Sequence, residues 1–288
     1  MKLVPCAAIM TGRPALSPRR ITSSLLALFS TVVWLAATPA QARPVCMIVA
    51  STSGTILHED GDCRTRVTPA STFKLALSLI GFDSGFLKDA HDPVLDFRTG
   101  DPDWGGRAWT QPNDPASWLR HSVVWYSQRI TRAIGPEELT RYAASFGYGN
   151  ADMSGDPGHD NGLERSWIAS SLKISPLEQV VFLGRLLERR LPVAARAIDQ
   201  TMSIVEQETS GGWIIRGKTG SAYPRKADRS FDRARGWGWY VGWARRDGRT
   251  FVFARLDQDE ARQSVSGGLR ARDALLKEWE AIAGDLRR

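Results

Sequence analysis

Two serine–lysine pairs in the sequence have a spacing that suits nucleophilic catalysis. S-T-F-K covers residues 71–74, and S-S-L-K covers residues 170–173. Residues three apart on a helix share one face, so the lysine can act as a base for the serine if burial lowers its pKa. A serine in the first helical turn also lies beside unpaired backbone N–H groups, which favour an alkoxide. Either copy alone is weak evidence, because most lysines are solvated surface charges.

A third candidate is K-T-G at residues 218–220, which is followed by Ser221. It ends the strand-like segment 213–218, where lysine supplies charge, threonine supplies a hydroxyl and glycine allows close backbone approach. This combination suits the binding of an anionic substrate. The tripeptide alone fits an ordinary junction of strand and loop equally well.

The order of the motifs is more specific than any one of them. S-x-x-K, a later serine element and K-T-G together are the signature of serine β-lactamases and penicillin-binding proteins. Here the segment 71–74 is followed by S-V-V at 122–124 and by K-T-G at 218–220. The copy at 170–173 leaves no room for a middle serine element before Lys218. The chain therefore resembles this superfamily, with Ser71 in the first motif.

Further segments narrow the resemblance to one class. The middle element is Ser-x-Val rather than Ser-Asp-Asn, which speaks against class A. Y-G-N at 148–150, Trp167 within S-W-I and the segment 238–243 look like class D β-lactamases, the oxacillinases. The similarity covers about residues 46–280. It implies an α+β, penicillin-recognising fold, with an antiparallel sheet flanked by helices and a helical subdomain.

The resemblance implies the catalytic residues Ser71, Lys74, Ser122, Lys218 and Trp167. Ser71 would be the nucleophile that opens the β-lactam ring. Lys74, kept neutral in an apolar pocket, would be carboxylated by CO2, and Trp167 would donate its indole N–H to the carbamate. The carbamate would be a better base than a protonated amine. Ser122 would relay a proton toward the β-lactam nitrogen. Apart from CO2 no cofactor is expected.

The resemblance also implies the substrate-binding residues Val124, Thr219, Gly220, Ser221, Arg270 and Trp109. Val124 would lie over Lys74 and limit the entry of water. The backbone N–H groups of Ser71 and Ser221 would form the oxyanion hole. A bulkier side chain often occupies the position of Ser221, so the resemblance does not fix the substrate range.

Two of these assignments have local alternatives. Arg270 would pair with the substrate carboxylate through a bidentate salt bridge, and the neighbouring Arg272 is the competing choice. Trp109 would be an aromatic at the rim of the site, although Trp104 and Trp118 lie close to it in the sequence.

Local patterns predict the elements that position these residues. Segments 47–50 and 55–58 predict a hairpin, and segments 213–218, 238–243 and 250–255 predict three further strands, the last two joined by an Asp-Gly turn. The capping box S-P-L-E at 175–178 opens a predicted helix that ends near residue 190. Further helices are expected at 71–80, 136–147, 193–207 and 269–286, and an irregular region at 82–120. The sheet part would cover about residues 43–80 and 195–288, and the helical part about 81–194.

The amino-terminal segment explains most of the net charge of +7. Residues 1–42 combine four basic residues, an apolar stretch at 21–37 and A-Q-A at 40–42, which is typical of a secretory signal peptide. A membrane anchor is the alternative, but the apolar stretch is short for a bilayer span. Cleavage would leave 34 basic against 31 acidic residues, a net charge of +3 in a single domain at 43–288. We therefore expect a periplasmic enzyme without nucleic-acid binding or stable membrane association.

The cysteines predict a disulfide, and the histidines give no sign of a metal site. Cys46 and Cys63 flank the predicted hairpin, so antiparallel strands would bring them together as a disulfide. Two free core cysteines are the alternative. The four histidines lack a metal-ligand spacing, so no metal site is expected. The oligomeric state is not predicted.

The predicted function is hydrolysis of a small-molecule β-lactam. Two alternatives share the serine and lysine motifs: a β-lactam sensor domain and a penicillin-binding transpeptidase, both acylated without rapid turnover. A sensor domain usually follows several membrane helices, and a transpeptidase would lack the context of Y-G-N and Trp167.

Overall fold

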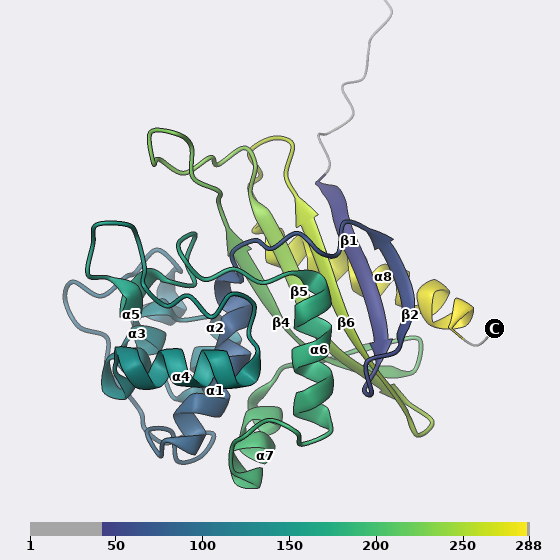
Figure 1. Ribbon diagram of the computed structural model, residues 1–288, viewed down its shortest axis with the longest axis horizontal. Coiled ribbons are helices and arrows are strands. Elements are labelled where there is room, and N and C mark those ends of the chain that lie inside the picture. Colours follow the sequence, from purple (N-terminus) through teal and green to yellow (C-terminus); the bar gives the residue numbers. More distant parts are fainter. Residues whose placement is uncertain (1–41, 287–288) are drawn as a thin grey trace, which may run out of the picture. The chain divides into compact units, whose positions relative to one another are not determined.

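The computed structural model describes residues 42–286, so the predicted signal peptide lies outside it except for its last residue. Six strands form one antiparallel sheet in the order β2-β1-β6-β5-β4-β3 (Figure 1). The strands are β1 (Arg43–Ser51), β2 (Ile56–Gly61), β3 (Gln207–Ser210), β4 (Trp213–Ala222), β5 (Trp237–Arg246) and β6 (Arg249–Gln258). The prediction of an α+β arrangement around an antiparallel sheet is confirmed.

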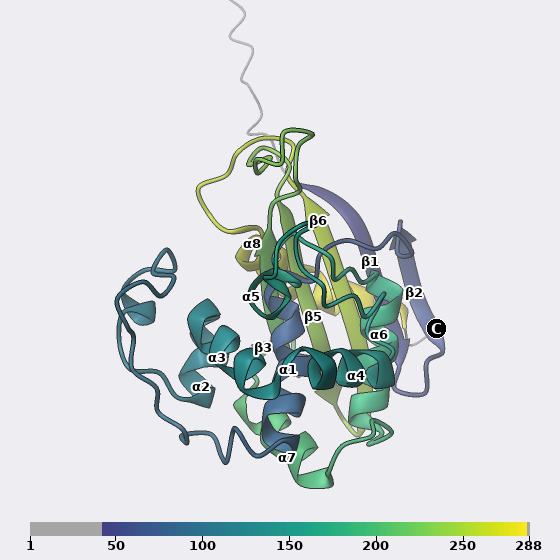
Figure 2. The same cartoon turned by 60° about the vertical axis from the view of Figure 1, so that its left-hand side comes forward.

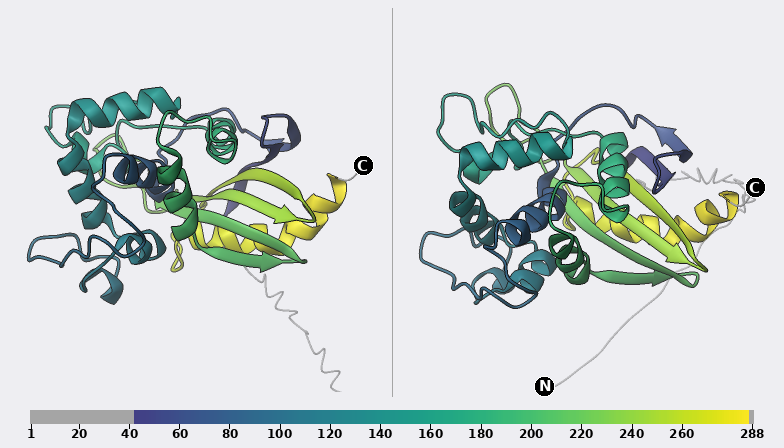
Figure 3. Two further views of the ribbon diagram at one scale, coloured as in Figure 1. Left: turned by 90° about the horizontal axis from the view of Figure 1, so that it is seen from below. Right: turned by 60° about the horizontal axis from the view of Figure 1, so that its bottom comes forward.

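Helices cover both faces of this sheet. The α-helices are α1 (Lys74–Asp83), α2 (Pro115–His121), α3 (Val124–Ile134), α4 (Pro136–Phe146), α5 (Gly162–Arg165), α6 (Pro176–Leu187), α7 (Ala195–Ile204) and α8 (Gly267–Asp285), and the short 3₁₀ helices are η1 (Ala70–Phe73) and η2 (Arg107–Trp109). Helix α6 packs on β1, β5 and β6, whereas α8 packs on β3 to β6. The turned views show α6 and α8 on opposite faces of the sheet (Figure 2, Figure 3).

The alternation of side chains along the strands creates two separate cores. In β1, Ile48 and Ala50 belong to the larger core, on the face of the sheet that α6 covers. Met47 and Val49 belong to the smaller core, on the face that α8 covers. Successive residues of a strand point to opposite faces, so a strand covered on both faces is apolar at nearly every position. This explains why β1, β5 and β6 consist of almost unbroken buried runs.

The amino-terminal hairpin forms as predicted. Strands β1 and β2 pair antiparallel, with Cys46 opposite Gly61. Cys46 and Cys63 form a disulfide with their Cα atoms 5.0 Å apart. The β5–β6 turn at Asp247-Gly248 is likewise confirmed, and both residues adopt a positive φ. The capping box that opens α6 is present, with the Ser175 hydroxyl accepting the N–H of Glu178.

The structure corrects three predicted boundaries and adds one helix. The first motif begins in a 3₁₀ turn, and the α-helix starts only at Lys74. Strand β4 continues to Ala222, so K-T-G lies inside the strand rather than at its end. Helix α7 stops at Ile204, because the chain extends at Val205 and enters β3 at Gln207. Helix α3 was not predicted. No helix within residues 42–286 is long and apolar enough to cross a membrane.

Candidate active site

The first serine–lysine pair lies where η1 passes into α1. Ala70 has a φ of 51°, a left-handed conformation that is rare for alanine and that turns the chain sharply before Ser71. Lys74 follows one turn later, and its Nζ lies 3.1 Å from Ser71 Oγ. The structure therefore brings this predicted nucleophile and base within hydrogen-bond reach.

Lys74 is fully buried at the start of α1. Burial, and then the positive charge of Lys218, lower the pKa of Lys74 well below its ordinary value. Loss of water disfavours the ammonium form of a lysine, and a second cation nearby adds to this effect. A neutral amine can accept the proton of the Ser71 hydroxyl, which an ammonium cannot.

A second serine–lysine contact faces the first. Ser122 ends α2 with a φ of 60°, and the left-handed turn aims its side chain toward β4. Lys218 Nζ donates a hydrogen bond to Ser122 Oγ at 2.9 Å and lies 3.1 Å from the carbonyl oxygen of Thr219. Burial lowers the pKa of Lys218 to about 8. The side chains of S-V-V and K-T-G thus meet across the boundary between helices and sheet.

Strand β4 passes unusually close to the turn that carries Ser71. A Cβ at Gly220 would lie 3.0 Å from the carbonyl oxygen of Pro69 and 3.0 Å from Cγ2 of Thr72. A side chain here would crowd the turn, so glycine favours this approach of strand and turn. Ser71 precedes Thr72 and Ser221 follows Gly220, so the approach brings the segments that carry both residues close together.

Trp167 lies in the buried aromatic group next to Lys74. Its ring stacks on Phe73 with centroids 5.6 Å apart, and Phe73 also meets Tyr148 edge-on. The Trp167 indole N–H is buried and finds no hydrogen-bond acceptor among residues 42–286. The indole N–H groups of Trp243 and Trp279 are unpaired as well, so it is the contact with Phe73, the neighbour of Lys74, that makes the Trp167 N–H a candidate donor for the site. Val124 is buried in the same core.

Arg270 lies in the first turn of α8, which packs against β4 and β5. The N–H of Gly268 donates to Ser221 Oγ at 2.8 Å, so this end of α8 adjoins the K-T-G strand. The Arg270 guanidinium is already paired with Asp259, which is almost fully buried. The competing Arg272 contacts Asp273 and Glu208 instead, beside β3.

Trp109 does not have the exposure expected of a rim aromatic. Trp109 is 3% exposed, and its indole N–H donates to the carbonyl oxygen of His121. The exposed aromatic of this segment is Trp104, which is 69% exposed and packs against the ring of Trp109. Trp118 is also fully buried. The sequence could not distinguish these tryptophans, because the segment has no regular periodicity.

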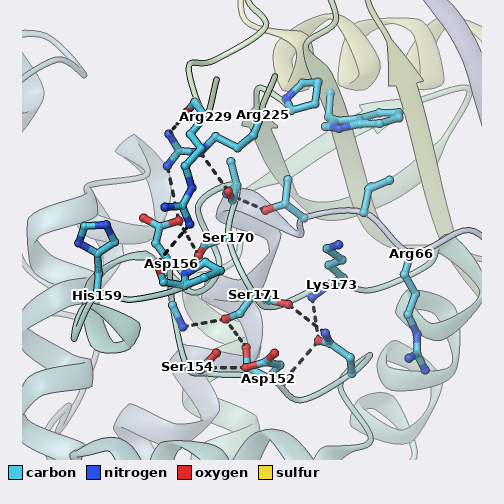
Figure 4. Close-up of a pocket in the computed structure, with 18 residues that line it drawn as sticks. Arg66, Asp152, Ser154, Asp156, His159, Ser170, Ser171, Lys173, Arg225 and Arg229 are labelled. Carbon is cyan, nitrogen blue, oxygen red and sulfur yellow. Dashed lines mark hydrogen bonds and ion pairs between the residues drawn. The ribbon is translucent and has the colours of Figure 1, made fainter. Parts of the chain in front are cut away.

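The second serine–lysine copy has no catalytic geometry. Residues 170–173 are not helical, the Ser170 hydroxyl donates to Asp156, and Lys173 is exposed. The copy lines a separate pocket of about 730 Å³ between the 150–171 segment and the loop after β4 (Figure 4). There Arg225 reaches Asp156 at 3.6 Å. The position of this copy agrees with the prediction that Ser71, and not Ser170, is the nucleophile.

Sequence reasoning assigned no role to Gln179 and Thr72, two polar residues that contact each other next to Ser71. Gln179 in α6 is fully buried, and its amide Nε2 donates to Thr72 Oγ1 at 2.8 Å. Gln179 precedes the buried residues Phe182, Leu183 and Leu186 at helical spacing. A polar residue on the apolar face of a predicted helix is the signal that could have revealed it.

Comparison with known proteins agrees with this geometry. Residues 47–279 match the family model "Penicillin binding protein transpeptidase domain". "Beta-lactamase OXA-9" of Klebsiella pneumoniae is 40% identical over 243 residues, which cover 83% of this chain and 88% of that protein. "Beta-lactamase OXA-1" of Escherichia coli is 34% identical over 212 residues and 73% of each chain.

A solved structure supports the same assignment. The structure of "OXA-427 class D beta-lactamase" aligns with a TM-score of 0.78 and 40% identity, covering 85% of this chain and all of that one. The predicted penicillin-recognising fold is therefore confirmed. Together with the paired serine and lysine side chains, these similarities show that the chain belongs to the class D β-lactamases.

Proposed function

We propose that this protein is a periplasmic β-lactamase that hydrolyses penicillins through an acyl-enzyme on Ser71. The observation that carries the proposal is the contact of Ser71 Oγ with a buried Lys74 whose pKa is strongly lowered. The family assignment supports a β-lactam as the substrate. Export rests on the leader-like segment at residues 1–42 and on the disulfide, which is typical of an oxidising compartment.

The described residues can support each chemical step of acylation. Lys74, in the carbamate form that its neutral amine would give with CO2, would accept the proton of Ser71 Oγ as the oxygen attacks the lactam carbonyl. The N–H groups of Ser71 and Ser221 stabilise the oxyanion that develops. Ser122, whose hydroxyl oxygen accepts a hydrogen bond from Lys218 at 2.9 Å, would relay the proton taken from Ser71 to the departing lactam nitrogen. The ring C–N bond breaks, and the acyl group stays on Ser71.

Deacylation needs a base that can activate water. A carbamate formed from Lys74 and CO2 would supply this base at neutral pH. The chain fits such a group, because the Lys74 amine is kept neutral and the Trp167 indole N–H has no acceptor among residues 42–286. Phe73 and Val124 add apolar walls that keep this part of the site dry.

Cationic side chains would bind the carboxylate of the substrate. Lys218 and Thr219 come from β4, and Arg270 comes from the start of α8. Arg270 keeps one guanidinium edge on Asp259, so its orientation is fixed before substrate arrives. Gly220 lets the strand pack closely on the turn that carries Ser71.

Steady-state hydrolysis of a chromogenic cephalosporin and of benzylpenicillin tests the function. We expect many turnovers per enzyme, no turnover for Ser71→Ala, and a rate that falls when CO2 is removed and recovers with bicarbonate. Trp167→Phe keeps the ring packing but lacks the N–H, so it should need more bicarbonate for the same rate. A single stoichiometric burst would instead favour a sensor domain or a transpeptidase, and indifference to CO2 would overturn the carbamate.

A further inference from the structure

A buried amide lies behind the nucleophile turn and has no place in the chemistry above. Gln179 is 0% exposed in the first part of α6. Its Nε2 donates to Thr72 Oγ1 at 2.8 Å and lies 3.5 Å from the hydroxyl oxygen of Tyr148. Its carbonyl oxygen finds no partner among residues 42–286. A buried group that keeps one good contact and leaves an acceptor unsatisfied calls for an explanation.

The direction of the Thr72 hydrogen bonds determines which end of the amide faces it. The Thr72 hydroxyl donates to the carbonyl oxygen of Pro69 at 2.7 Å, so its proton is already committed. The hydroxyl oxygen can therefore only accept from Gln179. The donor side of the amide must point at Thr72, and this orientation is not interchangeable.

These contacts hold Thr72 in one rotamer. Threonine is branched at Cβ, so fixing the hydroxyl also fixes the methyl group. Cγ2 of Thr72 lies 3.0 Å from the place where a Cβ at Gly220 would be, and the Thr72 backbone nitrogen lies 3.2 Å from it. The methyl group thus packs directly against the K-T-G strand. Another rotamer would push a different atom into the same contact and move the strand.

The two neighbours of this contact are the donors of the oxyanion hole. Ser71 precedes Thr72, and Ser221 follows Gly220. The separation of their backbone N–H groups therefore depends on how closely Thr72 packs on Gly220. We propose that Gln179 is a positioning residue that sets the width of the oxyanion hole by fixing the rotamer of Thr72. The proposal rests on the proposed function, since it concerns how the same site stabilises the transition state.

Two near-isosteric substitutions remove the hydrogen bond from either side. Gln179→Met keeps the length of the side chain without a donor, and Thr72→Val keeps the shape without the hydroxyl. We expect each to lower both the acylation and the deacylation rate about tenfold, less than the 10²–10³ lost with a whole oxyanion donor, because the donors are displaced and not removed. Thr72→Ser keeps the hydroxyl but removes the methyl group that packs on Gly220, so it should also be slower than wild type and isolates the contribution of the methyl contact.

The double variant Gln179→Met/Thr72→Val tests whether the two residues act as one unit. We expect it to be no slower than Thr72→Val alone, because Thr72→Val already removes the hydrogen bond from Gln179 together with the one to Pro69. Full multiplication of the two single effects would overturn the proposal.

A second readout separates positioning from general damage. A boronic acid inhibitor forms a tetrahedral adduct with Ser71, so its affinity reports on the oxyanion hole, whereas the initial binding constant of penicillin reports on the ground state. In Gln179→Met, boronate affinity should fall by about the same factor as kcat/KM, with initial penicillin binding and the ¹³C-carbamate signal of Lys74 unchanged. Equal losses of boronate and penicillin binding would contradict the proposal.

Phe182→Leu is the matched control. Phe182 is buried on the same helix, packs edge-on against Tyr148, and forms no part of the site. We expect this variant to lower the melting temperature at least as much as Gln179→Met without selective loss of boronate affinity.

Absence of hydrolysis by the wild-type protein would refute the proposed function itself, whereas a wild-type rate in Gln179→Met would refute only this inference.

Discussion

The site places two buried lysines of different character beside each other. Lys74 contacts Ser71 and faces the apolar aromatic group, so burial and the charge of Lys218 both lower its pKa. Lys218 is also buried, but Glu206 partly offsets the effect of burial, and its pKa falls only to about 8. At neutral pH one lysine is therefore available as a base, while the other remains a cation for an anionic substrate.

The pKa of Lys218 predicts a basic limb in the pH profile. Above pH 8 Lys218 loses the charge that attracts the substrate carboxylate, so kcat/KM for a penicillin should fall with an apparent pKa of about 8. Below pH 8 the ammonium form of Lys218 predominates, so Lys218 causes no fall in kcat/KM there. Measurement of kcat/KM from pH 6 to 10 checks this expectation.

Lys218→Arg provides the control, because arginine stays charged throughout this range. Its kcat/KM should be lower than wild type but flat above pH 8. A wild-type profile that stays level to pH 10 would show that Lys218 keeps an ordinary pKa.

The elements themselves differ in how far the sequence could predict them. The α6 capping box, the Asp-Gly turn and the β1–β2 hairpin depend on local residues, and all three were predicted. Helix α3 and the role of Gln179 depend on what packs against them from distant parts of the chain. The order of the motifs predicted that Ser122 and Lys218 belong to one site, whereas their hydrogen bond is visible only in the structure. The burial of Trp109 depends on an irregular segment with no such order.

The disulfide stabilises an element that lies away from the chemistry. It ties the β1–β2 hairpin at one edge of the sheet, whereas K-T-G lies in β4 toward the other edge. The double substitution Cys46→Ser/Cys63→Ser should lower the free energy of unfolding by about 3 kcal/mol, the value for a loop of about this length. Urea unfolding with and without reductant checks the loss.

The same variant should keep the kcat of the folded enzyme, because β6 and β5 lie between the hairpin and β4, the strand that carries K-T-G. Wild-type protein under reducing conditions should unfold at the same urea concentration as the double variant. A fall in kcat at temperatures well below unfolding would show that the hairpin supports the site directly.

At the scale of the whole described domain, the sheet separates two cores with different tasks. The larger core, on the α6 side of the sheet, contains Phe73, Val124 and Trp167, and the buried Lys74 follows Phe73 in the chain. The smaller core beneath α8 contains Trp213, Phe253 and Trp279, which form an aromatic cluster around α8. We expect damage to the second core to reduce stability without changing the chemistry.

Trp279 tests this separation. It is fully buried, and its indole N–H has no acceptor among residues 42–286, so its contribution comes from packing. Trp279→Ala should lower the free energy of unfolding by about 3–5 kcal/mol. Trp279→Phe should lower the free energy of unfolding by less, because it keeps an aromatic ring and removes the unpaired donor.

Both variants should keep the wild-type kcat per folded enzyme. Along α8, Trp279 lies about 16 Å beyond Gly268, the residue that contacts Ser221. Urea unfolding combined with active-site titration measures both quantities, and a loss of kcat in folded Trp279→Phe would mean that α8 transmits strain to the oxyanion hole.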